Sequence, residues 1–99
     1  MEENCYVEPM YKAASADQIR NADTALLAIG GMGCQNCATR IRNSLLALDG
    51  VYFVDIYLNL AIAEVSFDGQ KVSVKLLIEA VSRAGNDGRH EYNAELVAA

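Results

Sequence analysis

Two cysteines three positions apart, Cys34 and Cys37, are the residues of this sequence best suited to chemistry. They follow Gly31, Met32 and Gly33, where a strand-like apolar run stops and a helix-like run starts. A loop that enters a helix N-terminus presents unpaired N–H groups and the positive end of the helix dipole, so a cysteine there loses its proton more readily. Because the thiolate is the form that binds metal, the placement predicts a metal site.

The type and number of ligands narrow the metals that such a pair would hold. Soft thiolates favour Cu(I), Zn(II) and similar ions. Two ligands alone do not complete the four-coordinate shell of a structural zinc site. The pair therefore fits a d¹⁰ ion that accepts low coordination, Cu(I) first or Hg(II), with Zn(II) and Cd(II) as further possibilities.

Two more residues are candidate auxiliary ligands. Cys5 lies near the N-terminus and would reach the pair only if that segment folds back. His90, the single histidine, is expected at the start of the last strand. A lone histidine or an outlying cysteine is more often a solvated side chain than a ligand, so we expect neither to be essential.

The elements that must position the thiols follow from the periodicity of apolar residues. Residues 24–30 alternate as a strand, and residues 36–48 show helical spacing. Strands are expected over 51–58, 62–67 and 89–97, and a second helix begins after the N-cap Ser73 and ends near 84. This order predicts an α+β, ferredoxin-like βαββαβ sandwich, in which a four-stranded antiparallel sheet carries both helices on one face.

The N-terminal residues differ in composition from those that follow. Residues 1–23 hold the only proline, Pro9, and five acidic residues against two basic ones. We expect an N-terminal arm over 1–23, partly disordered and with a short helix within 12–22. One small domain over 24–99 then accounts for the rest of the chain.

Charge and hydropathy exclude several function classes. The net charge is −5 and the basic residues do not form one patch, which argues against nucleic acid. No apolar run approaches the ~20 residues of a membrane helix, so no direct membrane insertion is expected. No secretory signal is visible and the 3 cysteines are an odd number, which favours a reducing compartment, the cytoplasm.

The cysteine loop is followed by apolar residues at helical spacing and by a glycine boundary: Ile41, Leu45, Leu48 and Gly50-Val51. With the loop, they resemble the heavy-metal-associated domain family over about residues 24–97. That family includes cytosolic copper chaperones, N-terminal domains of copper and zinc P-type ATPases, and mercury-binding proteins. The resemblance implies that Cys34 and Cys37 bind the metal and that Met32 packs beneath the loop.

Two positions depart from the family's pattern. Gly33 stands where copper-handling members often have Thr and many zinc-transporting ATPases have Asp, so the acidic ligand expected for Zn(II) or Cd(II) is missing. Asn86 stands where the family tends to place Tyr, Phe, Lys or His near the metal. The residue that separates chaperones from ATPase domains is therefore absent.

These features predict a carrier rather than an enzyme. It would hold one Cu(I) through Cys34 and Cys37 and pass it by thiol exchange to a thiol-bearing metal-binding domain of a transporter or chaperone. It would act as a metallochaperone or as the soluble domain of a metal-transporting P-type ATPase, as a monomer or a metal-bridged dimer, and its acidity favours a basic partner. The alternatives are a dithiol-disulfide redox protein that uses the same pair, and two purely structural thiols.

Overall fold

The computed structural model describes residues 7–85 and 91–99. A short helix, α1, is the first regular element of the described residues, and four strands and two longer helices follow it. The elements are α1 (Ala16–Arg20), β1 (Asp23–Gly30), α2 (Gln35–Leu46), β2 (Val51–Tyr57), the 3-10 turn η1 (Leu58–Leu60), β3 (Ile62–Phe67), α3 (Val74–Ala84) and β4 (Asn93–Ala98).

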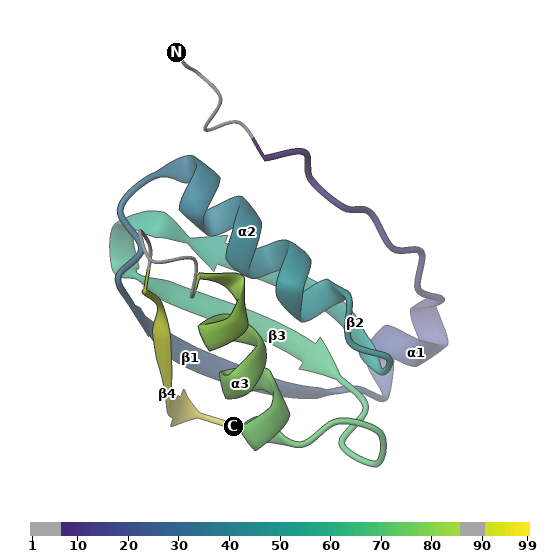
Figure 1. Cartoon of the computed structure of the whole chain (residues 1–99). Helices are drawn as coiled ribbons and strands as arrows, with labels where there is room; N and C mark the ends of the chain where they lie inside the picture. Colours follow the sequence, from purple (N-terminus) through teal and green to yellow (C-terminus); the bar gives the residue numbers. More distant parts are fainter. Residues whose placement is uncertain (1–6, 86–90) are drawn as a thin grey trace.

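The strands form one antiparallel sheet in the order β2-β3-β1-β4. Both α2 and α3 lie on the same face of this sheet (Figure 1). From β1 onward the order is strand, helix, strand, strand, helix, strand. The predicted ferredoxin-like sandwich is therefore confirmed.

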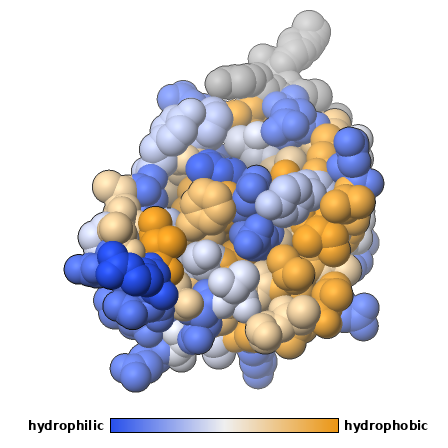
Figure 2. Space-filling model, turned by 180° about the vertical axis from the view of Figure 1, so that it is seen from behind, coloured by the Kyte–Doolittle hydropathy of each residue, from blue (hydrophilic) through white to orange (hydrophobic). Residues whose placement is uncertain are grey.

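Neither of the two long helices, α2 and α3, lies on the other face of the sheet (Figure 1). Phe53 and Tyr57, four residues apart on β2, share one face of the strand. They point to this side because Val54, which follows Phe53, is buried on the opposite face. Tyr57 donates a hydrogen bond to Glu64 Oε1 on β3 at 2.9 Å. Seen from behind, apolar side chains on this side of the molecule are interspersed with hydrophilic ones (Figure 2).

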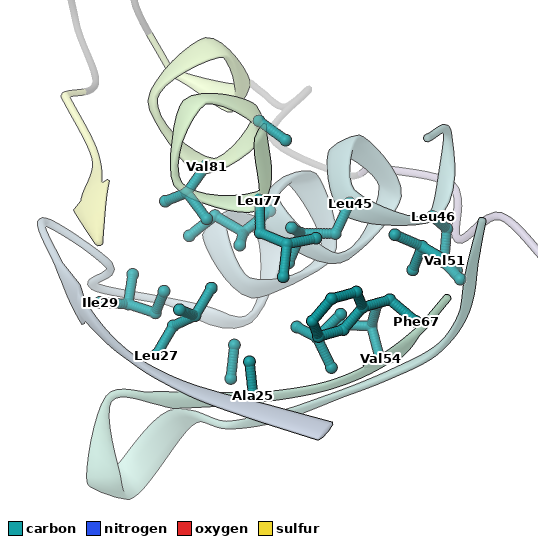
Figure 3. Packing of buried hydrophobic residues seen from close by; sticks show 14 of the residues in the cluster. Ala25, Leu27, Ile29, Leu45, Leu46, Val51, Val54, Phe67, Leu77 and Val81 are labelled. Atoms are coloured by element: carbon teal, nitrogen blue, oxygen red, sulfur yellow. The ribbon is translucent and has the colours of Figure 1, made fainter. Parts of the chain in front are cut away.

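The core lies between the sheet and the two helices. Alternate residues of β1 point inward, as their spacing predicts, and pack against one stripe of each helix (Figure 3). Fully burying a Leu or Ile side chain stabilises a fold by roughly 1.5–3 kcal/mol, so these residues fix α2 and the thiol that it carries. The fully buried members from β1, α2 and α3 are Ala25, Leu27, Ile41, Leu45, Leu77, Ala80 and Val81.

The structure confirms the predicted start of α3 and corrects the predicted end of α2. Ser73 caps α3, accepting a hydrogen bond from the backbone N–H of Leu76 at 3.2 Å, as predicted. Helix α2 ends at Leu46 rather than near Leu48. The reason is that the Leu48 N–H bonds to the Leu45 carbonyl, three residues back, which tightens the last turn. Leu48 nevertheless packs against the core.

The last strand differs from the prediction at both ends. It covers Asn93–Ala98, whereas the predicted strand spans 89–97; residues 91 and 92 form no strand, and residues 89 and 90 lie outside the described residues. Tyr92 is buried just before the strand begins. Leu96 does not reach the core and is 41% exposed. Among the described strands, β4 pairs with β1 alone and is an edge strand. Leu96 pairs with the buried Leu27 but is covered on one side only, which leaves it partly exposed.

The chain before β1 lies against the domain. Residues 7–15 form no regular element and run alongside α2 (Figure 1). Helix α1 follows, within the segment where a short helix is expected, and a capping box between Ser15 and Gln18 starts it. Among the described helices, none combines the length and apolar character needed to cross a membrane.

Candidate metal site

The two thiols stand at the junction between β1 and α2. Cys34 is the N-cap of α2, with an extended backbone (φ −156°, ψ 172°), and its side chain makes no capping hydrogen bond. Its sulfur is therefore not committed to the helix, and the residue is exposed. Cys37 lies in the first turn of α2 and is only 5% exposed. One sulfur thus faces solvent and the other is held by the core.

The separation of the sulfurs suits a shared ion. Cys34 Sγ and Cys37 Sγ are 3.4 Å apart, and both residues are free thiols. Metal–sulfur bonds of about 2.3 Å would let one ion contact both sulfurs in a bent arrangement. A linear arrangement needs about 4.6 Å between them, since two such bonds add end to end. Loading in a linear geometry therefore requires the exposed Cys34 to move outward.

The environment of Cys37 favours its thiolate. Burial raises the pKa of this thiol, but hydrogen bonds from the Tyr92 hydroxyl and from the backbone N–H groups of Gly33 and Cys34 outweigh it. The pKa falls from 9.0 to about 7. A substantial share of Cys37 is therefore ready to bind a soft metal at neutral pH, as expected for a thiol at a helix N-terminus.

Tyr92 is a site residue that the sequence analysis did not identify. It is 4% exposed, and burial raises the pKa of its phenol, with the hydrogen bond to Cys37 as the second cause. Its hydroxyl therefore stays protonated at neutral pH and remains a hydrogen-bond donor to the sulfur. The sequence shows Tyr92 only as one residue of an alternating run. Its approach to Cys37 depends on how β4 pairs with β1, which no local pattern reveals.

Gly31 makes the close approach of the loop to β4 possible. Its φ is +89°, a region that side chains disfavour, and an added Cβ would collide with the carbonyl oxygen of Glu91. The same Cβ would lie 3.4 Å from a ring atom of Tyr92. Gly33 differs, because no heavy atom lies within 4 Å of the position that its Cβ would take. The first glycine is a packing requirement and the second leaves open space beside Cys34.

The remaining sequence candidates fall outside this cluster. Met32 is partly buried and packs against the core, in agreement with the role that the family resemblance implies. Cys5, Asn86 and His90 lie outside the described residues. Within residues 7–85 and 91–99, no group of three or more His, Cys, Asp or Glu side chains gathers to hold a metal ion. In that part of the chain the candidate ligands are Cys34 and Cys37.

The heavy-metal-associated domain model matches residues 26–87, a span that includes the cysteine loop and both long helices. The chain belongs to the heavy-metal-associated domain family. The segment that runs along α2, helix α1 and strand β4 lie outside the matched residues.

Relatives of this domain handle two soft metals. The copper chaperone CopZ of Bacillus subtilis (strain 168) is 41% identical over 61 residues, which are 62% of this chain and 88% of that protein. The mercuric transport protein periplasmic component of Shigella flexneri is 36% identical over 73 residues, 74% of this chain and 80% of that protein. A solved N-terminal domain of a potential copper-translocating P-type ATPase from Bacillus subtilis, in the Cu(I)-loaded state, is 31% identical with a TM-score of 0.67, and the match covers 76% of this chain and 86% of that one.

Replacing Gly31 with alanine tests the close approach of the loop. We expect Gly31→Ala to lower the free energy of unfolding by about 2 kcal/mol or more, since it adds both a disfavoured φ and a collision with Glu91. Gly33→Ala is the matched control, and its effect should stay within about 0.5 kcal/mol. Urea unfolding followed by circular dichroism measures both. Equal effects of the two substitutions would contradict the packing role of Gly31.

Replacing Tyr92 with phenylalanine tests the hydrogen bond to Cys37. We expect Tyr92→Phe to raise the pKa of Cys37 from about 7 by about 1, because the thiolate loses a donor. The ¹³Cβ chemical shift of Cys37 against pH measures it in the metal-free protein. Tyr57→Phe, on the far face of the sheet, is the control and should leave the titration unchanged.

The same pKa also predicts a dependence of stability on pH. The thiol pKa is lower in the folded state, about 7, than its ordinary value of 9.0, so the unfolded chain binds more protons between these values. The free energy of unfolding of the metal-free protein should therefore rise as pH increases from about 7 to 9.0, and this gain is lost as pH falls through 7. A rise of the same size in Tyr92→Phe would contradict the assigned hydrogen bond.

Proposed function

We propose that this chain carries one Cu(I) ion between Cys34 and Cys37 and delivers it to a thiol-bearing metal-binding domain of a transporter or chaperone. The observation that supports this most strongly is the geometry of the two thiols. They lie 3.4 Å apart at the start of a helix, one exposed and one buried. Such a site holds an ion and still leaves one side open to an incoming ligand.

The ligand set supports Cu(I) over harder or more demanding ions. Two thiolates suit a soft d¹⁰ ion of low coordination number, and Zn(II) prefers four ligands. Position 33 supplies no carboxylate, because it is glycine. Relatives include copper chaperones and mercuric transport proteins, so Hg(II) is the ion closest in chemistry to the proposed cargo.

The difference between the two thiols suggests the order of transfer. An incoming thiol approaches the exposed side, and its sulfur binds the ion as its proton leaves. The Cys34 sulfur then dissociates and takes up a proton, while Cys37, held in the first turn of α2, remains bound until the acceptor's second sulfur replaces it. Each exchange breaks one metal–sulfur bond for each one formed, so the charge of the ion does not change and no oxidant is needed.

The partner and the compartment follow from charge and thiol chemistry. A net charge of −5 favours an acceptor with a basic surface, since opposite charges increase the rate of encounter. Arg40 on α2 adds positive charge close enough to act on the Tyr92 hydroxyl of the site. Free thiols persist in the cytoplasm, which is the compartment that we propose. The carrier is proposed to act as a monomer.

Titration with Cu(I) against a competing chelator tests the proposal. The reduced protein should retain one equivalent of Cu(I), and the Cys34→Ser/Cys37→Ser variant should retain none. Cys5→Ser is the control for loss of a thiol and should still hold one equivalent, which also tests Cys5 as an auxiliary ligand. If the wild-type protein held no Cu(I) but reduced insulin in a reaction that requires Cys34, the redox alternative would replace this proposal.

The open space at Gly33 allows a test of metal selectivity. We expect Gly33→Asp to raise the affinity for Zn(II) by about tenfold or more, because the carboxylate adds a ligand that Zn(II) accepts and the site has room for it. Gly33→Asn has nearly the same shape without the charge and is the matched control. Competition with a chromophoric zinc chelator measures both variants. Equal Zn(II) affinities would show that the side chain at position 33 does not reach the ion.

A further inference from the structure

The segment Val7–Lys12 is bound along α2 by side chains of that helix (Figure 1). Asn43 is central to this contact. Its Nδ2 donates to the Glu8 carbonyl at 2.8 Å, and its Oδ1 accepts from the Met10 N–H at 2.8 Å. One amide side chain thus holds two backbone groups, two residues apart on the same side of an extended segment.

The end of the segment away from the thiols is held firmly. Arg42 donates to the Met10 carbonyl at 2.7 Å, and its guanidinium lies 5.9 Å from the ring centre of Tyr11. Lys12 Nζ donates to the carbonyls of Leu46 and Leu48 at 2.9 and 2.8 Å. These carbonyls belong to the C-terminal end of α2, where a positive charge and a donor are both favourable.

The end of the segment near the thiols is held less firmly. The Val7 N–H donates to Asn36 Oδ1 at 3.3 Å, which is longer than the other bonds between the segment and α2. Asn36 lies between Cys34 and Cys37 in the chain and in the first turn of α2. The segment therefore reaches the edge of the metal site and has its weakest contact there.

Binding of a metal ion in a linear geometry would strain the contact between Val7 and Asn36. The sulfurs are 3.4 Å apart, and a linear geometry requires about 4.6 Å. Cys37 is anchored by the core, so a linear geometry would require Cys34 and the residues next to it to move. Asn36 belongs to the same turn, so its bond to Val7 is the contact of the segment that such a movement would disturb first.

We propose that Val7–Lys12 is a strap that restricts the approach of an acceptor to the metal loop and detaches at Val7 during transfer. The inference rests on the proposed carrier function. Contacts at Asn43, Arg42 and Lys12 keep the strap attached while its end beside Asn36 opens. The strap lies outside residues 26–87, which match the family model.

Exchange of Cu(I) between two copies of the full chain tests the strap. Unlabelled protein loaded with one Cu(I) is mixed with ¹⁵N-labelled metal-free protein, and NMR follows transfer to the labelled chain. We expect Asn43→Ala to exchange about fivefold faster than wild type, which corresponds to the loss of one net hydrogen bond. The Met10 amide proton should also exchange faster with solvent in this variant. Gln70→Ala removes an exposed amide at the opposite end of the sheet and should match wild type.

Lys12→Ala serves as a second variant that loosens the strap without changing the residues beside the thiols. It should also speed Cu(I) exchange and should keep one equivalent of Cu(I) bound. If the Met10 amide loses protection in either variant while Cu(I) exchange stays within about twofold of wild type, the strap does not restrict transfer. Unchanged protection of that amide in Asn43→Ala would overturn the proposed attachment. Failure of the wild-type chain to hold Cu(I) would instead refute the carrier function itself.

Discussion

The close contact between the cysteine loop and the residues that precede β4 is the constraint on which the site depends. Gly31 has no side chain and a positive φ, which lets the loop lie against Glu91 and Tyr92. Tyr92 can then donate to Cys37, whose helix is held from below by Ile41 and Leu45. Sheet pairing, loop conformation and thiol chemistry are therefore linked, because each requires the same short distance between two segments that are far apart in sequence.

The difference in burial between the two thiols would allow the site both to hold the proposed ion and to release it. A site with both sulfurs buried would hold an ion but exclude an incoming thiol. A site with both exposed would lose the hydrogen bonds that favour the Cys37 thiolate. Here Cys37 keeps those bonds in a largely dry environment, and Cys34 remains free to move because the helix does not use its side chain as a cap. The N-cap position is thus occupied by a candidate ligand at some cost in helix stability, typically about 1 kcal/mol for a missing cap.

Local patterns in the sequence predict most of the fold and the position of the two thiols at the start of a helix. The order of elements after residue 23, the Ser73 cap and the inward alternation of β1 all follow from spacing between neighbours, and the structure agrees. The sequence patterns do not predict features that depend on contacts between segments far apart in the chain. The contact of Tyr92 with Cys37 exists only after β4 has paired with β1. The attachment of residues 7–12 to α2 is of the same kind, since this short segment contains a proline and one residue of each charge, and no periodic apolar pattern in it predicts a docked segment.

Helix α2 therefore has three structural roles. Its inner stripe packs in the core, its first turn presents Cys37, and its outer side holds the N-terminal segment through Asn36 and Asn43. A helix that is fixed by its core contacts transmits little motion along its length, but its first turn is the part with the fewest backbone partners. Asn36 and Cys34 lie at that end of the helix, so we expect a change in the separation of the sulfurs to affect the contact with Val7 before the contacts of Asn43 and Lys12. This gradient follows from the position of the thiols at a helix end, and it would be absent if the pair lay in the middle of the helix.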